Sequence, residues 1–404
     1  MRVLMLPSWY PHAGDSLAGI FVRRQIEAVA RTCAVAVLCV VPDPGIEDGG
    51  FQVVGTDEGG LHVVRVRLGS NLPDFSPAGP TSPGYAAAAA AGLAHLMARW
   101  GFPDLCHVHV LPHPGRIALE LTARFGIPYV ISEHWSGYMA ADGRYQRAGN
   151  GSLTRAVVAG ASAVAPVSAA LCDAMRAQGL AAEYTVVPNV VPRRAGVSGP
   201  PALTDGLRLL CVARLDDGEK NLSGLLRALA RVPARQKARL ALDIVGGGPD
   251  RGPLEALCRD LALDGRVRFH GERPNAEIGD WLARCHMLVC NSWFETFSIS
   301  TAEALVHGRP VIATDCGGPA DYLDSACSLV VPTGDTAALA EALGRAEGSY
   351  PDLARSTTEA FDPQRFRAEA VGDTVLGLYR AALSVSRPAW QIGRAEPVSG
   401  CRQA

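Results

Sequence analysis

The chain has 404 residues, which is enough for two or three domains that each bury a hydrophobic core. Hydrophobic residues make up 48% and charged residues 19%, with a formal net charge of −2. This composition is that of a globular protein, and it excludes a strongly basic chain that would bind nucleic acid through its overall charge. The longest apolar stretches have the length of strands and are too short to span a membrane.

The first residues run directly into a strand-like segment, so we expect no signal peptide. The 11 cysteines are scattered without a Cys-x-x-Cys pair. We therefore expect a cytosolic protein with reduced, mostly buried thiols. Lysine occurs only at Lys220 and Lys237, whereas arginine is frequent. A chain that prefers arginine can retain a lysine where a compact ammonium group is needed. Lys237 has charged residues near it in the sequence, so we expect it to lie on the surface.

Strand-like runs alternate with helix-like segments in the first half of the chain. The predicted strands are residues 2–6, 35–41, 62–68, 104–110, 129–133, 163–168 and 184–188. The predicted helices include residues 20–31, 85–100, 115–125 and 169–178. This alternation predicts a parallel sheet with helices on both faces.

Glycine and proline interrupt this pattern at residues 192–202, and the alternation then restarts. The second set of predicted strands is 207–213, 240–246, 267–271, 287–291, 310–315 and 328–331, and residues 361–384 read as helical. The predicted organisation is an N-terminal domain (1–192), a linker (193–206), a second domain (207–370), a C-terminal helix (371–385) and a disordered tail (386–404).

The stretch 291–305 places two carboxylates, Glu295 and Glu303, beside a predicted strand-to-helix turn. The free N–H groups of the helix, predicted at 300–307, suit a phosphate, and the carboxylates suit sugar hydroxyls. Ser298 or Ser300 is expected to cap this helix. The alternative is an ordinary capped helix with solvated glutamates.

Two cations, Arg214 and Lys220, follow the first predicted strand of the second domain. A planar guanidinium and a compact ammonium together suit a pyrophosphate. The alternative is a pair of solvated cations beside Asp216, Asp217 and Glu219. Since Asp216 and Asp217 are adjacent, their side chains would point apart on extended backbone. We therefore expect cations, rather than a carboxylate-bound Mg²⁺, to balance the charge of a bound pyrophosphate.

Histidines follow two predicted strands of the first domain. His107 and His109 share one face of a strand, and a metal site would need His113 as a third ligand. We favour the interpretation that these histidines line the interdomain cleft over the interpretation that they bind a metal ion. His134 follows the next strand, where it either faces the cleft or is a satisfied polar residue. Trp135 beside it either lines the acceptor side or belongs to the core.

Glycines occur where a backbone can approach a phosphate closely. Gly19 opens the predicted helix 20–31, whose N-terminus favours negative charge. Gly246 and Gly247 lie in a Val-Gly-Gly-Gly-Pro turn between a strand and a helix.

Together these segments resemble glycosyltransferase family 4, the retaining nucleotide-sugar glycosyltransferases of the GT-B fold. The Glu-x7-Glu spacing, the Arg-Leu segment that leads to Lys220, and the opening Pro-Ser-Trp-Tyr-Pro string carry the resemblance. It implies an α/β protein with two doubly wound Rossmann-like domains facing each other across a cleft, and a last helix that crosses back to the first domain. The chain departs from the family pattern where it has Val190, Ala213, Asn221 and Asp321. Asp321 has a shorter side chain than the usual glutamate, so the alternatives to a direct sugar contact are an N-capping role and a structural role.

The resemblance also implies roles for the residues that match. Glu303 would hold the ribose hydroxyls, and His134 would contact the sugar from the other domain. Arg214 and Lys220 would stabilise the departing diphosphate. Glu295 would hold the donor sugar with the backbone of the residues that follow it, Thr296, Phe297 and Ser298. Gly19, Gly246 and Gly247 would lie near the donor.

The function that this resemblance implies is a retaining hexosyltransferase in surface polysaccharide or glycoconjugate synthesis. Its donor is a nucleotide-diphosphate sugar, its acceptor a glycan or lipid-linked molecule, and no cofactor or metal is expected. Same-face attack is favoured over Glu295 as a covalent nucleophile. The alternatives are another GT-B nucleotide-sugar enzyme, such as an epimerase, and a non-catalytic GT-B binding module.

The first domain is nearly neutral, since residues 1–192 contain no lysine and similar numbers of arginines and acidic residues. We therefore expect a cytoplasmic protein with at most weak peripheral contact at the inner face of the membrane. The predicted acceptor loops lie near residues 55–60, 70–84 and 139–151.

Overall fold

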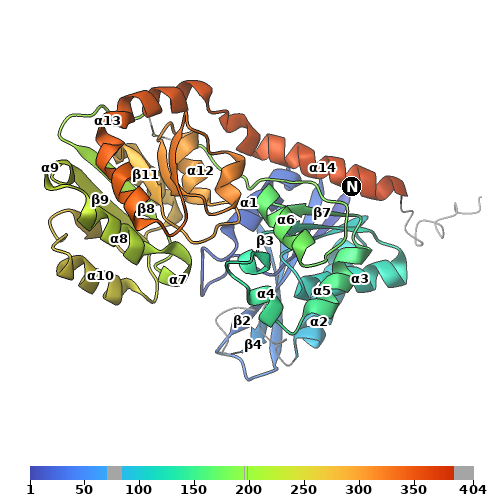
Figure 1. Ribbon diagram of the computed structural model, residues 1–404. Coiled ribbons are helices and arrows are strands. Elements are labelled where there is room, and N and C mark those ends of the chain that lie inside the picture. Colours follow the sequence, from blue (N-terminus) through green and yellow to red (C-terminus); the bar gives the residue numbers. More distant parts are fainter. Residues whose placement is uncertain (71–83, 195, 198, 386–404) are drawn as a thin grey trace, which may run out of the picture.

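The computed structural model describes residues 1–70, 84–194, 196–197 and 199–385 (Figure 1). The predicted tail and most of the predicted loop at 70–84 lie outside the described residues. Two α/β domains, each built on its own sheet with helices on both faces, lie side by side. The predicted fold class, two doubly wound Rossmann-like domains, is confirmed.

The first domain contains a sheet of strand order β3-β4-β2-β1-β5-β6-β7. Its strands are β1 (Arg2–Pro7), β2 (Ala34–Asp43), β3 (Phe51–Glu58), β4 (Leu61–Gly69), β5 (Leu105–His109), β6 (Tyr129–Glu133) and β7 (Ala163–Pro166). Its helices are α1 (Ile20–Ala30), α2 (Tyr85–Trp100), α3 (His113–Phe125), α4 (Arg144–Arg147), α5 (Gly151–Gly160) and α6 (Ala169–Ala177). Strands such as β1 and β5 are buried along almost all of their length because helices cover both faces of the sheet.

Strand β3 corrects the prediction of an acceptor loop at residues 55–60. It pairs antiparallel with β4 in an edge hairpin. Gly59 and Gly60 form the turn, with φ angles of 65° and 86° that suit a tight hairpin. The strand is largely exposed, so its sequence lacks the apolar run that marks the buried strands.

The predicted strand at residues 184–188 is also wrong. The structure has one isolated bridge there, between Val164 and Tyr184. The N–H groups of Thr185 and Val187 donate to β7, but Pro188 has no N–H group with which to continue a ladder.

The second domain contains a parallel sheet of order β10-β9-β8-β11-β12-β13. Its strands are β8 (Leu207–Val212), β9 (Leu240–Val245), β10 (Val267–Phe269), β11 (Met287–Cys290), β12 (Val311–Thr314) and β13 (Ser328–Val331). Its helices are α7 (Asp217–Lys220), α8 (Leu222–Arg231), α9 (Ala234–Lys237), α10 (Arg251–Asp260), α11 (Ile278–Arg284), α12 (Ile299–Val306) and α13 (Thr336–Ala360). The carboxyl ends of both sheets therefore supply the loops between the domains.

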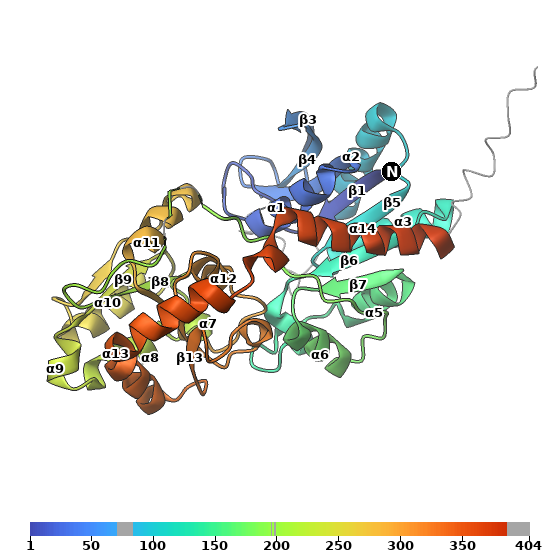
Figure 2. The same ribbon diagram turned by 90° about the horizontal axis from the view of Figure 1, so that it is seen from above.

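The last helix, α14 (Ala368–Val385), leaves the second domain and packs against α1 of the first (Figure 2). It begins later than the predicted residue 361, because Asp362 caps a short 3₁₀ turn at Pro363–Phe366 and Phe366 is fully buried. Tyr379 of α14 forms a 2.5 Å hydrogen bond with Nδ1 of His107. The C-terminal helix is thus fixed to the first domain by a buried polar contact.

We expect Tyr379→Phe to lower the free energy of unfolding by about 1–3 kcal/mol, because Nδ1 of buried His107 loses its partner. Denaturant unfolding measures this loss. Tyr184→Phe is the matched control: it removes a 2.8 Å bond to the carbonyl of Leu180 at a half-buried position that water can reach, so its loss should be smaller. Equal unfolding midpoints for wild type and Tyr379→Phe would contradict the anchoring role.

Candidate functional site

Two adjoining cavities lie between the domains. The first, here called the α1 cavity, has a volume of about 380 Å³ and is lined by α1 and by the loops of the second domain. The second, the His134 cavity, has about 430 Å³ and reaches toward Trp9, Trp135 and Asn189 of the first domain. The two cavities share a wall formed by Phe21, Arg214, Glu219, Lys220, Glu295, Ser298 and Ile299. The structure thus brings together most of the predicted site residues.

The backbone of the loop from Glu295 to Ser298 is fixed by the neighbouring Gly-Gly turn. The N–H of Glu295 donates to the carbonyl of Cys316, and the N–H of Gly318 donates to the carbonyl of Glu295, each at 2.8 Å. A Cβ atom on Gly318 would lie 2.0 Å from the carbonyl oxygen of Thr296, so this approach requires glycine. The hydroxyl of Tyr322 donates to the carbonyl of Ser298 at 3.0 Å. The loop is therefore held before any ligand binds.

The start of α12 carries no side-chain cap, so the predicted capping by Ser298 or Ser300 is wrong. Ser298 adopts a left-handed conformation with φ of 59°, and its hydroxyl lies 2.8 Å from that of Thr301. Ser298, Ile299 and Ser300 all line the α1 cavity. The free N–H groups of this helix end therefore lie beside the cavity, where they favour an anion.

Lys220 and Glu295 form an ion pair in the wall that both cavities share. The Nζ of Lys220 lies 2.8 Å from Oε1 of Glu295, which also accepts from the hydroxyl of Ser292 at 2.7 Å. Burial acts to lower the pKa of Lys220, but the Glu295 carboxylate outweighs it, so the pKa is raised and the ammonium stays charged. Lys220 is therefore a permanent cation whose charge is partly balanced by Glu295.

Arg214 is exposed and lines both cavities. Within the described parts of the chain, no carboxylate pairs with its guanidinium. Arg144, which the sequence did not indicate, reaches the same place from α4 of the first domain. It pairs with Asp142 at 2.7 Å and, across the cleft, with Glu219 at 3.1 Å. The predicted acceptor loop at 139–151 thus contributes a cation to the site.

Glu303 is already engaged by arginines. Its Oε1 accepts from Nη2 of Arg194 in the linker at 2.6 Å, and Nη1 of Arg24 in α1 lies 3.7 Å away. Both arginines also donate to Oδ1 of Asn275, at 3.1 Å from Arg194 and 2.7 Å from Arg24. The Glu303 side chain is only 4% exposed. The first domain, the linker and the second domain therefore meet at the residue that the sequence assigned to the ribose.

His134 lines the cavity that bears its name, where its ring lies beside the side chain of buried Asn189. Burial lowers its pKa to about 3, so the ring is neutral at physiological pH. The ring of Phe21 lies 4.9 Å from it.

His107 and His109 do not line either cavity, which corrects the prediction that they face the cleft. They are stacked 4.0 Å apart behind His134, and His107 is also bonded to Ser132 at 2.9 Å. The described residues contain no cluster of three or more His, Cys, Asp or Glu side chains arranged as metal ligands.

The predicted glycines lie next to the cavities rather than in their walls. Gly19 has a φ of 59° and lies against Trp9, whose carbonyl oxygen would be 2.3 Å from an added Cβ. At Gly246 an added Cβ would lie 1.8 Å from the carbonyl oxygen of Ala213. The loop before Arg214 therefore rests on the Gly246–Gly247 turn. The prediction that Gly19, Gly246 or Gly247 contacts the donor substrate directly stays a prediction.

Asp321 joins the two domains. Its Oδ2 accepts from the N–H of Ala169, at the start of α6 in the first domain, at 2.7 Å. This contact favours the structural role over a sugar contact. Asn189, which the sequence did not indicate as a site residue, is buried in the wall of the same cavity as His134.

Comparison with known proteins identifies the class of protein. A model of the glycosyl transferase 4-like domain matches residues 18–190, and a model of the glycosyl transferases group 1 matches residues 206–347. The chain is 28% identical over 271 residues to a D-inositol 3-phosphate glycosyltransferase of Frankia alni, covering 61% of this chain and 66% of that protein. It is 29% identical over 162 residues to the lipopolysaccharide 1,6-galactosyltransferase of Salmonella typhimurium, covering 39% and 44%.

Solved structures show the same fold. Sucrose-phosphate synthase of Thermosynechococcus elongatus matches 96% of this chain and 100% of its own, with a TM-score of 0.74 and 22% identity. The Anabaena protein HepE in complex with UDP matches 94% of this chain and 100% of its own, with a TM-score of 0.68 and 17% identity.

The chain belongs to glycosyltransferase family 4 and has the GT-B fold. Sequence matches to the first curated relatives span less than two thirds of their length, at 66%, 37% and 44%. No helix in the described part of the chain has the length and apolar character needed to cross a membrane.

We expect Arg194→Ala to lower the free energy of unfolding by about 1–3 kcal/mol, because the buried Glu303 carboxylate keeps only the more distant Arg24. In a double-mutant cycle, adding Glu303→Gln should recover part of this loss, since it removes the unpaired charge. The exposed pair Arg116–Glu120 is the control and should contribute less than about 1 kcal/mol. Strictly additive losses would show that Arg194 and Glu303 do not interact.

Proposed function

We propose that the chain is a retaining glycosyltransferase that moves a hexose from a nucleotide-diphosphate sugar to a glycan or lipid-linked acceptor without a metal ion. One observation carries the proposal. Arg214, the Lys220–Glu295 pair and the uncapped start of α12 form the wall between two cavities, with His134 on the opposite side. One cavity can hold a donor and the other can admit an acceptor.

The similar proteins support this assignment of substrate class. Their names include glycosyltransferases of D-inositol 3-phosphate and of lipopolysaccharide. HepE, which shares the fold, has been captured with UDP and with UDP-glucose. A role in surface polysaccharide or glycoconjugate synthesis follows from the same likeness and forms part of the proposal.

The donor would lie in the α1 cavity. Glu303 has one oxygen bound to Arg194, which leaves Oε2 to accept from a ribose hydroxyl. The diphosphate would meet Arg214, Lys220 and the N–H groups at the start of α12, which together stabilise the charge that develops on it. The sugar would then lie between Glu295 and the neutral ring of His134.

In the proposed reaction the bond between the anomeric carbon and the diphosphate oxygen breaks, and an acceptor oxygen forms the new bond on the same face. The acceptor proton passes to the departing diphosphate. Glu295 is a poor candidate for a covalent nucleophile, because Lys220 and Ser292 both hydrogen-bond to its Oε1. Its pairing supports a role in placing Lys220 and the sugar.

A lipid-linked acceptor would bring the chain to the cytoplasmic face of a membrane. The nearly neutral first domain supports weak contact that depends on the acceptor rather than on anionic lipid. The His134 cavity, with Trp9 and Trp135 in its walls, is the proposed entry for the acceptor.

We expect Lys220→Ala and Arg214→Ala each to reduce turnover about 10²–10³-fold, because each removes a cation that stabilises the leaving diphosphate. Lys220→Arg should restore activity only in part, since a planar guanidinium does not fit the place of an ammonium. Release of nucleoside diphosphate at saturating donor measures turnover. Lys237→Ala, which removes the other lysine of the chain, is the control and should keep it. Near-normal turnover in Lys220→Ala or Arg214→Ala would reject the phosphate assignment.

We expect activity to survive an excess of EDTA, because protein cations and helix N–H groups balance the diphosphate in this mechanism. The same turnover assay, with and without chelator, tests this. Loss of turnover in EDTA that Mg²⁺ or Mn²⁺ restores would show that the reaction needs a metal ion.

A further inference from the structure

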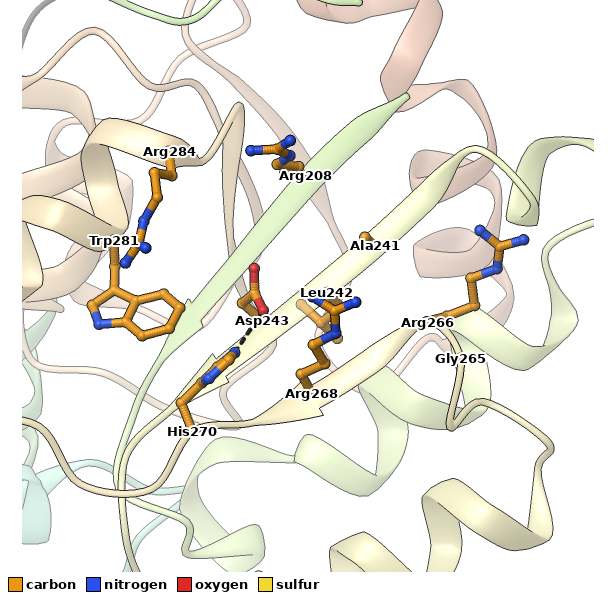
Figure 3. A pocket seen from close by; sticks show the side chains of 10 residues that line it. All are labelled: Arg208, Ala241, Leu242, Asp243, Gly265, Arg266, Arg268, His270, Trp281 and Arg284. Atoms are coloured by element: carbon orange, nitrogen blue, oxygen red, sulfur yellow. Dashed lines mark hydrogen bonds and ion pairs between the residues drawn. The ribbon is translucent and has the colours of Figure 1, made fainter. Parts of the chain in front are cut away.

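A third cavity, here called the arginine groove, lies on the second domain and is separate from the cleft. It has a volume of about 460 Å³ and is lined by residues of β8, β9, β10 and α11 (Figure 3). Four of these residues are arginines, Arg208, Arg266, Arg268 and Arg284. Helix α11 separates the groove from the cleft, since Ile278 at its start lines the α1 cavity whereas Trp281 and Arg284 line the groove.

The groove lies on the sheet face that α8 does not cover. Leu207 and Leu209 of β8 pack in one cluster with Leu225 and Leu229 of α8. Since side chains alternate along a strand, Arg208 points to the opposite face, where it is exposed.

The four guanidinium groups keep their charge available. Nη1 of Arg266 donates to the carbonyl of Ala238 at 2.6 Å, and Nε of Arg284 donates to the carbonyl of Asp280 at 3.0 Å. These backbone bonds orient the two groups without neutralising them. Arg208 and Arg268 are exposed, and no carboxylate among the described residues pairs with either. Elsewhere in the same domain, Arg239 and Arg251 are paired with glutamates at 2.6 Å and 2.8 Å.

Asp243 is the one carboxylate among the residues that line the groove, and it is engaged by a histidine. Its Oδ1 lies 2.6 Å from Nε2 of His270, and the His270 ring lies 4.2 Å from that of Trp281. The guanidinium of Arg284 lies 4.5 Å above the same Trp281 ring. This chain of contacts holds Arg284 in place. Figure 3 shows Arg208, Arg268 and Arg284 around Asp243.

We propose that the arginine groove binds the phosphate group of a small ligand. A planar guanidinium can donate two parallel hydrogen bonds to two oxygens of one phosphate. Several guanidinium groups around one cavity also repel one another until an anion binds. The volume is that of a small-molecule site. The phosphate is carried either by a soluble phosphate ester or by a lipid headgroup, and the two sources can be separated by experiment.

The test measures calorimetric binding of inorganic pyrophosphate to full-length protein with Arg214→Ala and Lys220→Ala, in which the cleft has lost its proposed phosphate cations. Adding Arg208→Gln and Arg268→Gln should weaken binding about tenfold or more. The control adds Arg227→Gln and Arg231→Gln instead, which removes the same charge from exposed positions on α8, and it should bind as the parent does.

A second measurement uses co-sedimentation with phosphatidylcholine vesicles that contain phosphatidic acid. Groove-dependent binding of free pyrophosphate supports a soluble phosphate ester, and groove-dependent binding to vesicles alone supports a lipid phosphate. The proposal is overturned if the parent binds neither probe, if the groove variant binds both as the parent does, or if the α8 control loses binding equally.

Discussion

The site depends on one close backbone contact between two loops of the second domain. Gly318 lies directly against the carbonyl of Thr296, and the loops exchange hydrogen bonds at Glu295. Any side chain at Gly318 would push the loops apart, moving Glu295 and with it the ammonium of Lys220. Helix α12 begins at Ile299, three residues after Thr296, so the same contact also holds the start of this helix. The cation, the carboxylate and the helix end are thus placed together by backbone geometry.

The two domains are joined at several separate points around the cleft. Arg24 and Arg194 meet Asn275 and Glu303 at one point, and Asp321 accepts from the first N–H of α6 at another. Helix α14 adds a third connection through Tyr379 and His107. The first of these includes a buried carboxylate, which favours full pairing because an unpaired buried charge is strongly unfavourable. The relative placement of the domains is therefore coupled to groups that line the α1 cavity.

Much of the fold was predictable from the sequence because buried parallel strands leave a strong apolar pattern. Edge strand β3 was not predictable, because its exposed residues carry no such pattern. It is a strand because its backbone forms hydrogen bonds with β4. In the site, Glu295, Arg214 and Lys220 were predictable from their places after strands. Arg144 and Arg194 were not, because each reaches the cleft from a segment without a recognisable motif. The pairing of Glu303 with Arg194 joins residues far apart in sequence, and spacing alone cannot show it.

Arg194 connects the linker to two residues that line the α1 cavity. The same guanidinium holds the carbonyl and side chain of Asn275 and one oxygen of Glu303. Because Arg194 occupies only Oε1, the free Oε2 of Glu303 can accept from a ligand in the α1 cavity while the linker stays bound. By reciprocity, if the contact with Arg194 orients Glu303 for such a ligand, binding of the ligand stabilises the position of the linker by the same free energy. The linker is thus thermodynamically linked to the α1 cavity as well as being a connection between domains.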